Sequence, residues 1–194
     1  GMKLSVHDSA ATMAAAAAEH AAAVLRRALA ERERVAFVAA TGASQFEFLR
    51  RLVQAPDLAW ARLTMFHLDE YLGMGQDHPA SFRRYLQERL VSRVPLGTVH
   101  YIAGDAPDPA AEVARLNRLL ADTPVEVAFV GIGENGHLAF NDPPADFAAT
   151  APYIVVELDE ACRCQQFGEG WFASLDDVPR RAISMSIGQI MKSA

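Results

Sequence analysis

Short, continuously apolar runs alternate with longer segments of helical periodicity along this chain. Residues 35–40 (VAFVAA) and 125–133 (VEVAFVGIG) are the clearest runs, and such runs are typical of strands buried on both faces of a parallel sheet. Between them, apolar residues recur at the three- and four-residue spacing of a helix. The alternation predicts an α/β protein, with a mostly parallel sheet and helices on both faces.

The same pattern predicts the order of the elements. Strands are expected at residues 35–40, 61–69, 99–104, 125–133, 153–158 and 181–187. Helices are expected from the caps Asp8 and Ser9 to about residue 33, then at 45–54, at 78–91 after entry at Pro79, at 108–122, and before the last strand. No repeat or linker interrupts the series, so we expect residues 1–194 to form one domain. The chain stops where a further helix begins, which favours a protein truncated at its C-terminus.

Composition narrows the class of protein. The 194 residues are 51% hydrophobic and 22% charged, which excludes a disordered or fibrous polypeptide. A net charge of −6 argues against nucleic acid or an anionic membrane as the main partner, although a local nest of amides can still bind an anion. We see no signal peptide, and we expect Cys162 and Cys164 to be reduced thiols, so a cytoplasmic location is predicted.

Unusual residues follow three predicted strands, at the sheet edge where ligands of open α/β sheets bind. The first group is the loop of Thr41, Gly42, Ala43, Ser44 and Gln45, whose small residues and successive amides suit a phosphate. A tight turn with Ser44 as the helix cap is the alternative. The loop lacks the glycine spacing and the lysine of a dinucleotide fingerprint or a P-loop.

The other two groups can transfer protons. Asp69 ends the strand predicted at 61–69 and Glu70 follows it; both carboxylates are expected to face the crevice rather than the core, with a solvated turn as the alternative. The glycine-rich segment 131–144 holds Asn135, His137 and Asp142, and a histidine there can shuttle a proton near neutral pH. A flexible connection with a merely hydrogen-bonded histidine is the alternative.

A metal site is not predicted. The available ligands are His67, Asp69, His78, His137 and Asp142. No pair of them has the HExxH spacing or another metal-binding signature. We therefore expect chemistry without a metal.

Three segments together resemble one known family. The blocks FHLDEYLGMGQDHPASFRRYL (66–86) and GIGENGHLAFNDP (131–143), in this order after ATGAS (40–44), are similar to glucosamine-6-phosphate deaminases (isomerases), whose wider superfamily includes 6-phosphogluconolactonase. Lactonases typically carry DER and GHTASLF in these blocks, whereas this chain has Tyr71 and GHLAFN. The resemblance implies a modified doubly wound α/β fold, no cofactor, and conversion of glucosamine 6-phosphate and water to fructose 6-phosphate and ammonia.

The resemblance also assigns roles to residues. Asp69 would move a proton between C2 and C1 of the opened sugar, and His137 would act on the ring oxygen during ring opening. Asn135 and Asp142 stand where the family has an aspartate and a glutamate, which weakens the negative charge around His137. The expected substrate-binding residues are Thr41, Gly42, Ala43, Ser44, Gln45, Glu70, Gly136, Arg163 and Gln166.

Two other functions stay open at this point. One is a lactonase of the same superfamily, in which His137 acts on water. The other is a non-catalytic sensor of sugar phosphates, because a fold does not fix a function. The expected partner is a phosphorylated amino sugar, and a homo-oligomer is left open by the sequence.

Overall fold

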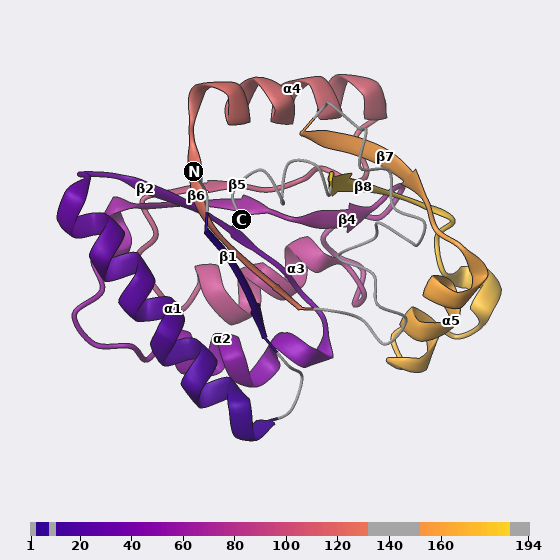
Figure 1. Ribbon diagram of the computed structural model, residues 1–194. Helices are drawn as coiled ribbons and strands as arrows, with labels where there is room; N and C mark the ends of the chain where they lie inside the picture. The colour runs from indigo at the N-terminus through magenta and orange to yellow at the C-terminus, as the bar shows by residue number, and fades with distance from the viewer. Residues whose placement is uncertain (1–2, 8–10, 132–151, 187–194) are drawn as a thin grey trace.

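The computed structural model describes residues 3–7, 11–131 and 152–186, and these residues form two β-sheets (Figure 1). The larger sheet is parallel, with the strand order β1 (Lys3–His7), β6 (Val125–Gly131), β2 (Val35–Ala39), β3 (Leu63–His67) and β5 (Thr98–His100). The smaller sheet is antiparallel, with the order β4 (Asp69–Tyr71), β8 (Arg181–Met185) and β7 (Tyr153–Glu157). The predicted α/β class with a mostly parallel sheet is confirmed.

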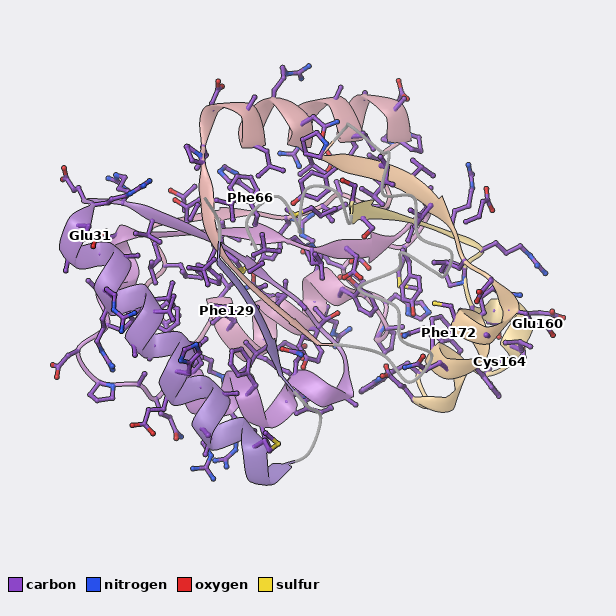
Figure 2. The ribbon with its side chains drawn as sticks, in the orientation of Figure 1. Glu31, Phe66, Phe129, Glu160, Cys164 and Phe172 are labelled. Atoms are coloured by element: carbon purple, nitrogen blue, oxygen red, sulfur yellow. The ribbon has the colours of Figure 1, made fainter. Side chains whose placement is uncertain are left out.

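The central strands are apolar at consecutive positions because both faces of the larger sheet are covered. On one face, Phe129 packs in a core formed with α1 (Ala11–Glu31) and α2 (Phe46–Leu52). On the other face, Phe66 packs in a core formed with α4 (Pro109–Asp122) and with β7 and β8. Figure 2 shows these two aromatic side chains on opposite sides of the sheet. Consecutive residues of a strand point to opposite faces, so both must be apolar here.

Two further helices lie toward the small sheet. The helix α3 (Phe82–Leu86) continues as a π-helical segment, Gln87–Val91, and α5 (Glu160–Gly168) follows β7. The predicted helix at 78–91 is thus present, but it begins later than the predicted proline entry. Its start is fixed by Ser81, whose Oγ accepts the Arg84 N–H at 3.2 Å as an N-cap.

The predicted strand at 61–69 needs correction. It ends at His67, and Asp69 begins β4 of the other sheet. Leu68 joins the two sheets, because its N–H donates to the Ala39 carbonyl at 3.1 Å and its carbonyl accepts the Met185 N–H at 2.9 Å. The chain therefore changes sheets where the sequence predicted one continuous strand.

The ends of the expected elements differ in smaller ways. The strand β1 was not predicted, and β7 and β8 belong to the small antiparallel sheet rather than to the main one. The predicted caps Asp8 and Ser9 lie outside the described residues. Among the helices in the described ranges, none combines the length and apolar character needed to cross a membrane.

Candidate active site

The loop after β2 depends on a glycine and on a tyrosine brace. Gly42 has a φ of 107°, a conformation that residues with a side chain rarely adopt. Its carbonyl accepts the Gln45 N–H at 3.0 Å and the Tyr85 hydroxyl at 2.7 Å. A 3₁₀ turn, Ala43–Gln45, then leads into α2, whose N-cap position is Gln45 rather than the alternative Ser44. The strand–loop–helix order that the sequence predicts here is confirmed.

Gln45 is buried, in contrast to Thr41, Gly42 and Ala43 of the same loop. Its side chain is 1% exposed, and neither its Oε1 nor its Nε2 has a hydrogen-bond partner in the described part of the chain. A buried amide without partners costs free energy.

The loop and Asp69 leave the same edge of the larger sheet. Ala39 of β2 and His67 of β3 are paired in parallel strands. Thr41 and Asp69, each two residues further along the chain, therefore follow neighbouring strand ends. The register confirms the expectation that polar groups gather at the carboxyl ends of the strands.

Glu70 is used by the protein itself. It is 1% exposed, and its Oε2 accepts hydrogen bonds from the Ser81 hydroxyl at 2.8 Å and from the Arg83 N–H at 2.9 Å. Its Oε1 accepts the N–H groups of Phe82 and Tyr71. Burial raises the pKa of Glu70, and these four hydrogen bonds oppose the rise. The expectation that Asp69 and Glu70 face the crevice is not met: both are buried, and neither is among the residues that line the pocket beside the loop after β2. The Glu70 carboxylate instead holds the start of α3.

Asp69 differs from its neighbour. It is 5% exposed and paired with Ser184 in the β4–β8 ladder, so the backbone fixes its position. Burial, and secondly the charge of Glu70, raise its pKa to about 8. A carboxyl group with this pKa can both accept and return a proton near neutral pH.

The histidines on the described part of the chain do not form a metal centre. His67 is fully buried, and its Nδ1 accepts the Ile102 N–H at 3.3 Å. Burial, and secondly the charge of Arg83, lower the pKa of His67 to about 3, so the ring is neutral. His78 uses its Nδ1 to accept the Ala80 N–H at 3.0 Å. Within residues 3–7, 11–131 and 152–186, no three potential metal ligands come together.

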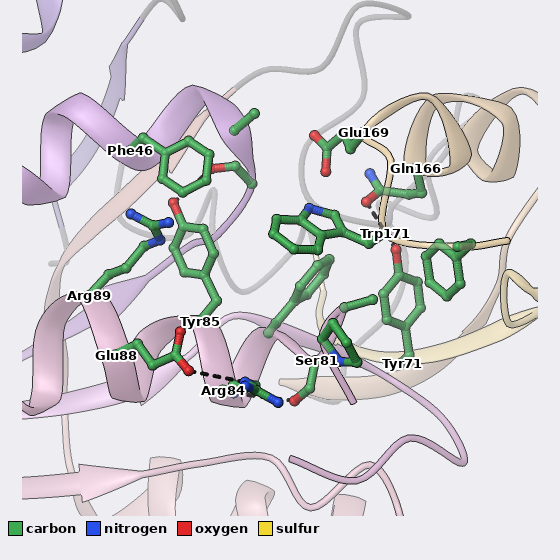
Figure 3. A pocket seen from close by; sticks show the side chains of 16 residues that line it. Phe46, Tyr71, Ser81, Arg84, Tyr85, Glu88, Arg89, Gln166, Glu169 and Trp171 are labelled. Carbon is green, nitrogen blue, oxygen red and sulfur yellow. Dashed lines mark hydrogen bonds and ion pairs between the residues drawn. The ribbon is translucent and has the colours of Figure 1, made fainter. Parts of the chain in front are cut away.

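A pocket opens between the loop after β2, the α3 segment and α5 (Figure 3). Its empty volume, including the mouth, is about 530 Å³. Aromatic rings dominate its lining, with charged side chains between them. The lining side chains labelled in Figure 3 are Phe46, Tyr71, Ser81, Arg84, Tyr85, Glu88, Arg89, Gln166, Glu169 and Trp171.

The pocket includes some of the predicted substrate-binding residues and leaves others out. Gly42 and Ala43 line it, and so does Gln166, whose Oε1 accepts the Tyr71 hydroxyl at 2.9 Å. Arg163 does not line the pocket. Its guanidinium is 5% exposed and donates to the carbonyls of Leu175 and Val178, so it anchors the segment after α5. The expectation that Arg163 contacts substrate is therefore wrong.

Most of the lining residues were not predicted from the sequence, among them Tyr85, Arg89, Glu169 and Trp171. Tyr85 and Arg89 lie on the face of the α3 segment that borders the pocket, and Glu169 and Trp171 follow α5. Tyr85 and Arg89 are four residues apart, which places them on one helical face, so a search for polar and aromatic residues at that spacing could have identified them. The sequence around Glu169 and Trp171 contains no comparable spacing pattern from which they could have been identified.

The third predicted group cannot be placed. Asn135, Gly136, His137 and Asp142 all lie outside the described residues. Their expected roles therefore stay predictions from the sequence. Asp69 is the predicted catalytic residue whose surroundings the structure describes.

Comparison with known proteins identifies the family. The family of glucosamine-6-phosphate isomerases/6-phosphogluconolactonase matches residues 8–159, so the chain belongs to that family. Over 152 residues, the chain is 40% identical to the glucosamine-6-phosphate deaminase of Streptococcus pneumoniae serotype 4 (strain ATCC BAA-334 / TIGR4), and equally to that of strain Hungary19A-6. These matches cover 78% of this chain and 63% of each relative's length.

Solved structures agree with this assignment. A monomeric glucosamine-6-phosphate deaminase superposes with a TM-score of 0.82 at 28% identity, covering 99% of this chain and 79% of that one. A 6-phosphogluconolactonase from Shewanella baltica OS155 gives a TM-score of 0.74 at 17% identity, and the match covers 98% of this chain and 77% of that one. The second likeness shows the fold alone. The modified doubly wound fold implied by the sequence resemblance is confirmed.

Proposed function

We propose that this protein converts glucosamine 6-phosphate, or a close relative of it, and water to a ketose 6-phosphate and ammonia. Membership of the family and 40% identity to proteins named glucosamine-6-phosphate deaminase support the proposal. The observation that carries it is the position of Asp69: buried, held by β4, and at the same sheet edge as the loop after β2.

The proposed chemistry uses Asp69 as the base. With the sugar ring open, its carboxylate removes the proton from C2, which bears the amine, and returns a proton at C1. The product is the imine of the ketose, and water releases ammonia from it. Electrons move only within the substrate, so the balance requires no cofactor. A pKa of about 8 suits a group that must both take and return the proton.

Other roles complete the proposal. We place the substrate's phosphate at the loop from Thr41 to Gln45, where Gly42 allows a close backbone approach. His137, with Asn135 and Asp142 nearby in the sequence, is proposed to act in ring opening. The single domain, the cytoplasmic location and a homo-oligomer remain predictions.

The test is the appearance of ammonia together with fructose 6-phosphate when the purified chain is given glucosamine 6-phosphate. We expect both products in equal amounts. A lactonase would hydrolyse 6-phosphogluconolactone and release no ammonia, and a non-catalytic sensor would do neither. Absence of ammonia, with folding verified by circular dichroism, would refute the proposed function.

A further inference from the structure

Two arginines line the pocket, and among the described residues they have different partners. Arg84 donates to the Glu88 carboxylate at 3.0 Å and to the Asp77 carbonyl at 2.8 Å. Arg89 makes neither a hydrogen bond nor an ion pair with the described residues. Its guanidinium lies instead over the Phe46 ring, 3.7 Å from the ring centroid. The polar edges of the Arg89 guanidinium therefore have no anionic partner in this pocket wall.

The stacking directs Arg89 toward the loop after β2. Phe46 directly follows that loop, and the Tyr85 ring, 5.2 Å from the guanidinium, carries the hydroxyl that binds the Gly42 carbonyl. Figure 3 shows Arg89, Phe46 and Tyr85 together on one wall of the pocket. Stacking occupies the face of a guanidinium and leaves its N–H edge available for an oxyanion.

The opposite wall carries an acidic side chain. Glu169 lines the pocket together with Ala43 of the loop after β2. Burial raises the pKa of Glu169, and the backbone N–H of Ala43 opposes the rise. When Glu169 is ionised, its carboxylate repels an anionic ligand in this pocket.

We propose that Arg89 is the cation that binds the phosphate monoester of the substrate in this pocket, and that the charge of Glu169 on the opposite wall weakens this binding. This inference adds a phosphate-binding residue to the proposed function and rests on it, because the substrate is the amino-sugar phosphate proposed above. Glu169 lines the same pocket, so its negative charge and that of the phosphate repel each other. A guanidinium can supply the paired N–H donors that a phosphate prefers.

The test is binding of inorganic phosphate and of glucosamine 6-phosphate to the full chain, measured by calorimetry. Replacing Arg89 with Gln removes one charge-assisted contact, so the affinity for both ligands should fall about 10- to 100-fold. R89K keeps the positive charge but lacks the paired N–H donors of the guanidinium, so its loss of phosphate affinity should be intermediate. The control R93Q removes the same charge from an exposed position outside the pocket and should change the affinity less than twofold.

A second variant tests the role of Glu169. E169Q keeps the size of the side chain without its negative charge, so it should bind phosphate several-fold more tightly than the unmodified chain. Glucosamine without phosphate serves as the comparison ligand, and its affinity should not respond to either substitution. Unchanged phosphate affinity in a folded R89Q variant, or weaker phosphate binding in E169Q, would overturn the proposal.

The outcomes also separate this inference from the proposed function. If phosphate binding depends on Arg89 while no ammonia is released, the phosphate site stands and the deaminase proposal fails. If ammonia is released and R89Q leaves KM and phosphate affinity unchanged, the deaminase proposal stands and the phosphate site fails.

Discussion

At the residue scale, the adjacent carboxylates Asp69 and Glu70 have different surroundings. Glu70 has a structural role, and Asp69 has the proposed catalytic one. Glu70 accepts four hydrogen bonds around the start of α3, so its oxygens are occupied. Asp69 is buried beside it, and the neighbouring charge contributes to raising its pKa. A protein that fixes one carboxylate in this way can raise the proton affinity of the next.

A buried neutral histidine should make the fold sensitive to acid. The pKa of His67 is lowered to about 3 in the folded chain. Between pH 6.5 and 3, His67 therefore binds a proton in the unfolded chain but stays neutral in the folded one. The stability that neutral His67 contributes is present above pH 6.5 and is lost as the pH falls toward 3. Urea unfolding at pH 7, 5 and 4 should show the cost of H67Q shrinking by up to about 1.4 kcal/mol per pH unit.

The exposed Gln54, whose amide does not titrate, provides the control for this series. The free energy lost in Q54A should stay nearly constant over the same pH range. A cost of H67Q that stays equally constant from pH 7 to pH 4 would contradict the argument from burial.

Residue roles were only partly predictable from sequence. Small residues at a strand end predicted a loop before a helix, and Gly42 and Ala43 of that loop line the pocket. Their contact with a phosphate stays a prediction. Arg163 and Glu70 turn inward to bind backbone groups that come from distant parts of the chain. Such partners are set by tertiary packing, which residue type and spacing do not reveal.

At the element scale, Arg62 stabilises the C-terminal end of α1 from a distance. Its guanidinium donates to the carbonyls of Leu29 at 2.8 Å, Arg32 at 2.7 Å and Glu33 at 2.7 Å. The last carbonyls of a helix lack partners within it, and a cation is favoured there. We expect Arg62→Ala to lower the free energy of unfolding by about 1–3 kcal/mol.

Chemical denaturation measures the free energy of unfolding of this variant and of the control R51A. Arg51 is exposed and approaches Glu47 only to 3.9 Å, so its removal should cost less than about 0.5 kcal/mol. Equal losses in the two variants would mean that the contacts of Arg62 with α1 contribute nothing beyond surface charge.

Element type was more predictable than sheet membership. The apolar runs identified β2, β3 and β6, because strands covered on both faces are apolar at every position. The change of sheet at Leu68 depends on pairing with Met185, which lies far along the chain. Local periodicity therefore could not distinguish one long strand from β3 followed by β4.

At the scale of the whole molecule, the two sheets bring the reaction groups to one end. The parallel sheet ends at the loop after β2, and the small sheet continues from β3 with Asp69 as its first residue (Figure 1). The pocket lies between that loop and α5, on the side where α3 packs. Gly104 permits this arrangement, because a Cβ there would meet the Tyr71 carbonyl of β4 at 2.1 Å.

The most direct test of the central claim is the pH dependence of kcat/KM for ammonia release from glucosamine 6-phosphate, with the unmodified chain and D69N. The base must be ionised, so the rate should rise with pH through about 8, the pKa of Asp69. D69N should lose about 100- to 10,000-fold in kcat with KM little changed, whereas D122N, an exposed control, should not. Near-normal turnover by D69N, with the same pH profile, would contradict the account.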